Sequence, residues 1–233
     1  YLWCRVGPHA DYKVTGNKNN VFEALLETKD GYMQIGDDLV FDTLLLSNIQ
    51  CEADGSFEIL LSANKPEGFS GNFMHMPPGT QYWCVRQYFA DWETEIPARF
   101  EIHRVDGEGV PPAPLTPARM AELLDEAGRW TLQTTKFWAE WIDQLRGDHE
   151  KGRLMAPKPF VGGARDIVYG NDWWSLDPDE AMIVEIEVPD ARYWQLQLCD
   201  VWFRTMDWAT RQTGLNHAQS YVHADGRVRF VIA

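Results

Sequence analysis

Runs in which apolar and polar side chains alternate recur along most of this chain, and they restrict its fold more than any other feature. A period of two places successive side chains on opposite faces of an extended strand. Glycine, proline and aspartate, which favour turns, separate the runs from one another. The clearest runs cover residues 10–16, 53–62, 97–105, 181–188 and 193–198. This pattern predicts a mainly β protein built from short antiparallel strands.

One segment between these runs has a different period. Residues 106–115 contain three prolines, and proline at this density excludes a helix or a central strand, so we expect a linker or loop there. Thr116 is the predicted N-cap of a helix with Pro117 at its first position. Apolar residues then recur at steps of three and four until Gly147. Gly128 leaves open whether this helix is long or broken, and its Trp-rich stripe is interpreted as a face packed on the β strands, with cofactor contact as the alternative.

The chain therefore divides into three predicted parts. Residues 1–105 form a first β unit, 106–165 a Pro-rich linker and helical insertion, and 166–233 a second β unit. A-D-G-S-F-E-I-L-L-S at 53–62 resembles A-D-G-R-V-R-F-V-I-A at 224–233. We interpret this sequence similarity as evidence of two related β units, with coincidence as the alternative. Both ends of the chain fall within strand-like runs, so we expect both to be cut and the second unit to be truncated at its C-terminal end.

Composition limits the classes of partner. The formal net charge is −14 and the pI about 4.8, which argues against nucleic acid or an anionic membrane surface as a partner. An apolar content of 45% predicts a packed core. No apolar run approaches the ~18 residues of a membrane span, and no signal peptide is visible. We expect a soluble protein whose compartment stays open, with a small preference for the cytoplasm, and four cysteines that serve as buried small hydrophobes.

The main candidate site follows the last alternating run. Acidic, basic and aromatic residues are interleaved from Asp200 to Arg211, and this mixture suits a lined cleft better than a plain solvent face. The candidates for catalysis are Asp200, Asp207, Arg211 and Arg86. The candidates for substrate binding are Trp202, Trp208, Arg204, Asn216, His217 and Gln219.

These residue types suit acid–base work on a ring-bearing compound. Two carboxylates near arginines can differ in protonation, one staying ionised while the other acts as an acid, and glycoside cleavage uses such a pair. Trp202 and Trp208 can supply flat apolar faces for a sugar or another ring. Arg86 lies within an apolar strand, where an unpaired guanidinium would be costly, so we expect a carboxylate partner, which the segment 200–211 can supply. The alternative is that all these groups form structural ion pairs.

Other reaction classes lack their signatures. None of the six histidines has the spacing of a metal-ligand motif, and there is no G-x-S-x-G elbow, P-loop or dinucleotide fingerprint. We therefore expect no metal and no cofactor, and serine hydrolase, NTPase and NAD-dependent activities are disfavoured.

Three stretches resemble the DUF1214 family, which comprises bacterial proteins of unknown function that are often associated with a neighbouring DUF1254 domain. The stretches are Y-W-Q-L-Q-L-C-D-V-W-F, R-Q-T-G-L-N-H-A-Q and A-D-G-R-V-R-F-V-I-A. Upstream, N-D-W-W-S-L-D-P-D-E-A and V-R-Q-Y-F-A-D-W-E-T-E-I-P-A are similar to the flanking regions of that family, and the resemblance is best over residues 169–233. It implies a jelly-roll-like antiparallel β-sandwich with a helical insertion, and it implies no settled reaction.

Two hypotheses for function remain, and whether the chain is an enzyme stays open. In the first, it acts on a carbohydrate or another small polar or aromatic compound. Asp200 and Asp207 then do acid–base work, and Arg86 and Arg211 hold negative charge. In the second, it is a non-catalytic ligand-binding or assembly module with the same residues in structural ion pairs. The Trp-rich helix would then serve a homo-oligomer contact.

Overall fold

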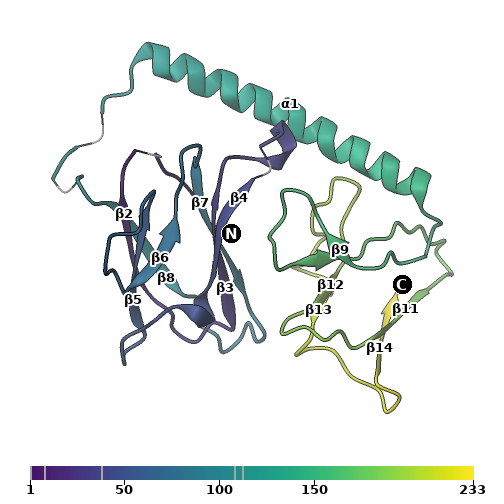
Figure 1. The fold of residues 1–233 in the computed structure, drawn as a ribbon. Coiled ribbons are helices and arrows are strands. Elements are labelled where there is room, and N and C mark those ends of the chain that lie inside the picture. The colour runs from purple at the N-terminus through teal and green to yellow at the C-terminus, as the bar shows by residue number, and fades with distance from the viewer. Residues whose placement is uncertain (1, 8, 38, 108, 112) are drawn as a thin grey trace. The chain divides into compact units, whose positions relative to one another are not determined.

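The computed structural model describes residues 2–7, 9–37, 39–107, 109–111 and 113–233. Glu108 and Pro112, within the predicted linker, lie outside the described residues. The chain forms two compact units (Figure 1). Unit 1 consists of Tyr1–Gln133 and Pro159–Ile167, and unit 2 of Thr134–Lys158 and Val168–Ala233.

The described part of unit 1 contains eight strands in two four-stranded sheets. The strands are β1 (Leu2–Arg5), β2 (Tyr12–Asn17), β3 (Glu23–Lys29), β4 (Val40–Leu45), β5 (Ser56–Ser62), β6 (Asn72–His75), β7 (Tyr82–Tyr88) and β8 (Arg99–Arg104). One sheet has the order β1-β7-β3-β4 and is antiparallel throughout. The other has the order β6-β5-β2-β8, in which the β5–β6 pair is parallel and the remaining pairs are antiparallel. Two short 3-10 helices, η1 (Met33–Ile35) and η2 (Leu46–Asn48), flank β4.

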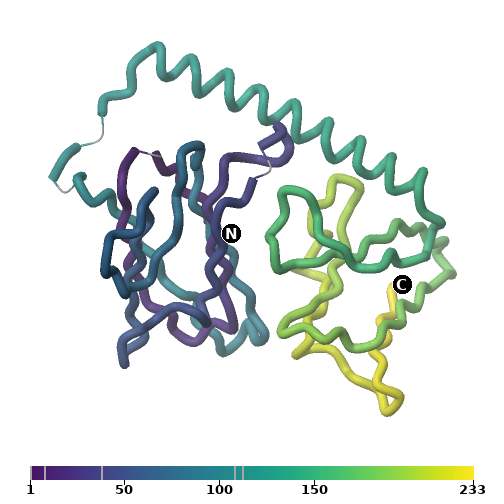
Figure 2. The backbone as a smooth tube through the Cα atoms, in the orientation of Figure 1, coloured from purple at the N-terminus to yellow at the C-terminus, as the bar shows by residue number. Residues whose placement is uncertain are grey.

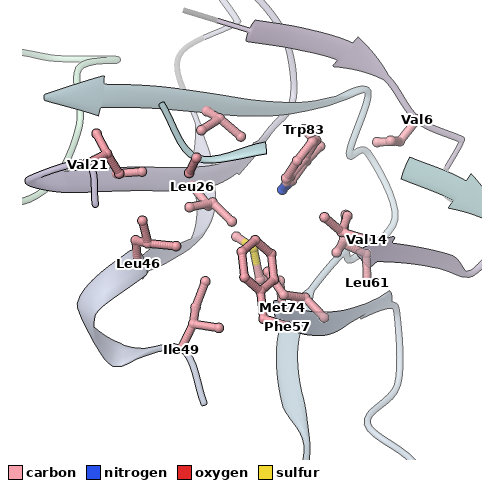
Figure 3. Packing of buried hydrophobic residues seen from close by; sticks show 14 of the residues in the cluster. Val6, Val14, Val21, Leu26, Leu46, Ile49, Phe57, Leu61, Met74 and Trp83 are labelled. Atoms are coloured by element: carbon pink, nitrogen blue, oxygen red, sulfur yellow. The ribbon is translucent and has the colours of Figure 1, made fainter. Parts of the chain in front are cut away.

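The two sheets of unit 1 share one hydrophobic core. Leu26 of β3 and Trp83 of β7 meet Phe57 and Leu61 of β5 and Val14 of β2 in a buried cluster (Figure 3). Each of these strands turns alternate side chains toward the core, as the period of two requires. Two sheets packed on a common core make a β-sandwich. The predicted mainly β fold, with antiparallel sheets and a helical insertion, is confirmed.

The predicted helix is a single helix, α1 (Pro117–Asp148). The helix starts where the sequence predicts, because the hydroxyl of the predicted N-cap Thr116 accepts a hydrogen bond from the Arg119 backbone N–H at 3.2 Å. The helix continues without a break through Gly128, since one glycine costs a helix interior only about 1 kcal/mol. Residues before Thr134 belong to unit 1 and those from Thr134 onward to unit 2.

Four of the strands that follow α1 have only two or three residues. They are β9 (Lys158–Pro159), β10 (Val168–Tyr169), β11 (Met182–Glu187), β12 (Gln195–Gln197), β13 (Gly214–Asn216) and β14 (Arg227–Ile232). They form two-stranded sheets, β9 with β10, β11 with β14 and β12 with β13. In the β11–β14 sheet, Val228, Phe230 and Ile232 are buried. The alternating run 193–198 thus yields only a three-residue strand, β12.

The two similar stretches of sequence begin with turns of the same geometry. In Asp54-Gly55 and Asp225-Gly226 the glycines have φ of 82° and 77°, a region that favours glycine. The aspartate carboxylate accepts a hydrogen bond from the backbone N–H of Ser56 at 2.9 Å in the first turn and of Arg227 at 3.1 Å in the second. The second turn can be followed near the yellow end of the tube in Figure 2. The relation between whole β units stays a prediction, because β5 pairs with β2 whereas β14 pairs with β11.

Replacement of the core residue Leu26 by alanine should lower the free energy of unfolding of unit 1 by about 2–5 kcal/mol, because the fully buried side chain leaves a cavity. Denaturant unfolding followed by tryptophan fluorescence measures this change. Val110→Ala is the control, because Val110 in the segment before α1 is 65% exposed and its loss should be nearly neutral. Equal losses from both variants would contradict the described core.

The β11–β14 sheet predicts a pH dependence of stability. The Arg229 guanidinium donates hydrogen bonds to Asp225 and lowers the pKa of that carboxyl from 3.8 to about 2. A lowered folded-state pKa stabilises the fold above about pH 4, and this contribution is lost as the pH falls from about 4 to about 2. Asp225→Asn should therefore melt below the wild type at pH 5, and the difference should shrink toward pH 2. Melting curves across this range test it, and a difference that is independent of pH would refute it.

Candidate functional site

The predicted site segment in unit 2 is a loop closed by its own backbone. After β12, Cys199 and Thr205 form an isolated antiparallel bridge. Within it, the Asp200 backbone N–H donates to the Arg204 carbonyl at 2.8 Å, and the Phe203 N–H donates to the Asp200 carbonyl at 2.9 Å. Residues 199–205 therefore form a tight hairpin turn rather than a continuation of the strand.

Asp200 is the centre of this hairpin. Its carboxylate accepts hydrogen bonds from the Arg204 guanidinium at 2.8 and 2.6 Å and from the backbone N–H groups of Trp202 and Arg204 at 2.9 and 3.1 Å. The Arg204 hydrogen bonds, aided by those from the backbone, lower the pKa of Asp200. The Arg204 side chain is 73% exposed, so this ion pair faces solvent. Its main effect is to close the hairpin.

Asp207 has a similar local role. Its carboxylate accepts hydrogen bonds from the hydroxyl and the backbone N–H of Thr210, and the hydroxyl bond lowers the pKa of Asp207. Arg211 is exposed and adds a weaker favourable charge. Both candidate acids are thus stabilised in the ionised form, whereas a general acid at neutral pH needs a raised pKa.

The aromatic residues of the loop differ in their packing. Trp208 is 74% exposed and Trp202 is 43% exposed. Phe203 stacks on Trp138 of α1, with ring centroids 4.9 Å apart, and meets Trp141 edge-on at 5.0 Å. Phe203 has a φ of 58°, an uncommon value for a bulky residue, and this conformation together with the two tryptophans fixes the tip of the loop. Phe203 was not among the predicted site residues, because its contacts depend on the placement of α1.

The remaining predicted binding residues hold the turn after β13. Asn216 is buried, and its side-chain oxygen accepts hydrogen bonds from the backbone N–H groups of Ala218 and Gln219 at 3.0 and 3.1 Å. The Gln219 side-chain oxygen in turn accepts the Asn216 backbone N–H at 3.0 Å. His217 contacts the Tyr193 ring edge-on, with centroids 5.3 Å apart. These contacts account for the turn within unit 2.

Arg86 belongs to unit 1, in β7, and is paired in register with Leu25 of β3. The segment 200–211 belongs to unit 2. A centre shared by Arg86 and the acids of this segment stays a prediction.

Unit 1 contains a cleft that the sequence analysis did not identify. Its volume is about 530 Å³, which suits a small molecule. The lining residues come from β1, β7, the region of η1 and the first half of α1. They are Arg5, Tyr32, Ile35, Asp37, Gln81, Tyr82, Arg119, Glu122, Asp125, Glu126 and Arg129. No local motif connects these residues, because they are brought together by the fold.

A network of phenol, guanidinium and carboxylate groups forms the wall of the cleft. The Arg5 guanidinium donates to the Tyr82 hydroxyl at 2.8 Å, is ion-paired with Glu126 and lies 5.4 Å from the Tyr82 ring centroid. The Tyr32 and Tyr82 rings are 4.8 Å apart. Burial, with a hydrogen bond to Tyr82, raises the pKa of Tyr32 to about 12, so this phenol stays protonated at neutral pH. A second pair joins Arg119 to Glu122 at 2.7 Å.

Neither unit offers a metal centre in the part of the chain that the structure describes, where no three His, Cys, Asp or Glu side chains are grouped to hold an ion. All four cysteines are free thiols. Cys84 is buried as expected, whereas the other three are only partly buried. Within the described residues, no helix combines the length and apolar character needed to cross a membrane.

Comparison with known proteins links the chain to domains of unknown function. Residues 149–228 match the model of DUF1254, described as a protein of unknown function. The expectation of such a domain is confirmed, whereas the particular resemblance to DUF1214 is not supported by this match, which covers much of the same stretch. The crystal structure of an uncharacterised protein from Burkholderia cenocepacia is similar, with 32% identity and a TM-score of 0.90. The alignment covers 99% of this chain and 64% of that one, so the chain spans less than two thirds of the length of this relative. No curated protein matches the chain.

Proposed function

We propose that this chain is a non-catalytic ligand-binding module and that its ligand site is the cleft of unit 1. The observation that carries the proposal is the grouping of phenol, guanidinium and carboxylate side chains around a space of about 530 Å³. Sites for small molecules combine a concave surface of this size with a few convergent polar groups. The chemistry of those groups then decides the class of ligand.

The lining groups favour a ring that carries several hydroxyl or carboxylate groups. Guanidinium groups and the amide of Gln81 donate hydrogen bonds, and the carboxylates of Asp125 and Glu126 accept them. The rings of Tyr32 and Tyr82 supply apolar surface beside these polar groups. A carbohydrate, or another small polar ring-bearing compound, matches both features. An acidic sugar has the further advantage of a charge-assisted hydrogen bond to an arginine.

A binding role agrees with the electrostatics of unit 2. The carboxylates of Asp200 and Asp207 both have lowered pKa values and close local turns. Neither is arranged as a general acid with a raised pKa. The acids of this segment therefore support the structural interpretation over the catalytic one.

Assembly is a second part of the proposed role. Met120, Leu124 and Leu132 are exposed on α1, and their spacing in multiples of four places them along one side of the helix. Exposed apolar residues in such a row are typical of contact surfaces between proteins. The module thus combines a polar ligand cleft with an apolar helix surface available for a homo-oligomer contact.

Replacement of Arg129, an exposed cation that lines the cleft, should selectively weaken the binding of acidic sugars. Glucuronate and glucose are the probes, and their binding is followed by calorimetry and by chemical-shift changes of unit 1. Arg129→Ala should weaken glucuronate binding about tenfold or more, because a charge-assisted hydrogen bond is lost, and should change glucose binding less.

Arg99→Ala is the matched control for this test, since Arg99 is an exposed arginine on β8 that does not line the cleft. It should leave the binding of both probes unchanged. If neither probe binds at millimolar concentration, or if both variants weaken binding equally, the cleft is not the site of such a ligand.

The alternative, an enzyme acting on a carbohydrate or related compound, has one observation in its favour. Trp202 and Trp208 are exposed aromatic surfaces in the segment that carries Asp207. Asp207→Asn separates the two functions, because the exposed carboxylate contributes little to the fold and its loss should shift the melting temperature by less than about 2 °C. Under the binding proposal, this variant retains full affinity for the probes. A glycosidase activity in the wild type that the variant loses would instead establish the enzyme.

A further inference from the structure

The sheet β1-β7-β3-β4 carries polar side chains on the face that points away from the sandwich core. Leu26 of β3 and Val85 of β7 point into the core, so their neighbours Glu27 and Cys84 lie on the opposite, outer face. The register pairs Glu27 with Cys84 on one side and with Thr43 of β4 on the other. Cys84, Glu27 and Thr43 therefore form one row across three adjacent strands.

Two atoms of this row are buried without a partner. Glu27 is 1% exposed, and its Oε2 accepts the Cys84 thiol at a sulfur–oxygen distance of 3.8 Å. Its other oxygen, Oε1, and the Thr43 Oγ1 have no hydrogen-bond partner among the residues that the structure describes. A buried polar atom left unpaired is costly, and such atoms in native proteins are nearly always paired with protein, water or ligand. Two such atoms in directly paired positions indicate that a further group belongs between them.

A single oxygen atom is the simplest group that can pair with both side chains. Side chains at directly opposite positions of an antiparallel pair have Cβ atoms about 4.5–5.5 Å apart. One bridging atom can then lie at hydrogen-bonding distance, about 2.7–3.0 Å, from both side chains. A hydroxyl group both donates and accepts, so it can donate to the Glu27 oxygen and accept from the Thr43 hydroxyl.

The surroundings of the row favour a neutral group over a metal ion. Burial and the nearby Glu27 charge raise the pKa of Cys84 to about 12, so its thiol is protonated and donates to Glu27. Lys29, two residues along β3, already places a positive charge on this side of the sheet, and its Nζ donates to the Gly162 carbonyl at 2.8 Å. The segment 159–167, which also contacts β4 through Arg165 and the Val40 carbonyl, contributes to the cover of this face.

We propose that Glu27 and Thr43 bind one hydroxyl oxygen between them, in a buried site on the outer face of this sheet. The oxygen belongs either to an ordered water or to an alcohol group of a small molecule. Tyr82, two residues before Cys84 on the same face of β7, lines the cleft, so the site and part of the cleft wall share one face of the sheet. The site nevertheless stands on its own observations and does not require that the cleft binds a sugar.

Thr43→Val tests the site, because the proposal and its alternative predict opposite changes in the melting temperature. Valine has the shape of threonine without the hydroxyl. If the hydroxyl binds a bridging oxygen, its removal leaves that oxygen and Glu27 poorly paired, and the melting temperature should fall by about 2–6 °C. Thr28→Val is the matched reference, since the Thr28 hydroxyl donates to the His75 carbonyl at 2.8 Å in the same unit and should show a fall of similar size. A melting temperature that rises in Thr43→Val would mean that the hydroxyl is an unpaired group better replaced by a methyl, and this would overturn the proposal.

High-resolution crystals of the wild type distinguish the two sources of the oxygen. A single isolated peak of electron density, within hydrogen-bonding distance of Glu27 Oε1 and Thr43 Oγ1, identifies water. After a soak in ethylene glycol, a peak that extends into a carbon chain identifies an alcohol. Either result supports the site, and the absence of density between the two atoms under both conditions would overturn it.

Discussion

The in-register pairing of β3 with β7 is the constraint on which the structure of unit 1 depends. It places Leu26 opposite Val85 on the core face and Glu27 opposite Cys84 on the outer face. A slip of one residue would move every side chain of β3 to the other face and bury two carboxylates and a lysine in the sandwich core. Because that cost is prohibitive, the same register fixes both the core and the polar rows of the outer face.

The outer face of this sheet carries buried polar side chains, Glu23, Glu27 and Lys29 of β3 among them. Tyr82 of β7 is paired with Arg5 of β1, and together they line the cleft. One row further along β7 is Cys84, the neighbour of Glu27. The inner face of the sheet serves stability alone, since it is packed with apolar side chains as any sandwich core is. The outer face carries buried polar groups, which are costly to the fold unless they are paired, and the proposed ligand sites would use some of them.

The elements that depend on neighbouring residues could be predicted from the sequence. Alternation located β2, β5 and β8, the Asp54-Gly55 pair located a turn, and Thr116 marked the start of α1. In each case the cause lies within a few residues, as a side-chain period, a positive φ or a cap. The strand predicted over residues 193–198 was too long. A strand needs a partner, and β13 pairs with only three residues of β12. The cleft could not be predicted at all, since Arg5 reaches Tyr82 and Glu126 across 77 and 121 positions of sequence.

Sequence separation also explains why the segment 200–211 of unit 2 was predicted to be a functional site. Its acids and bases lie close together in the chain, and the structure pairs them with near neighbours, Asp200 with Arg204 and Asp207 with Thr210. Polar groups a few residues apart can satisfy one another within a turn, so their proximity in sequence needs no ligand to explain it. Groups that a fold brings together from different strands, such as Glu27 of β3 and Thr43 of β4, are not placed together by a single turn. When such groups are also buried and left with an unpaired atom, a bound molecule becomes the simplest physical explanation for their arrangement.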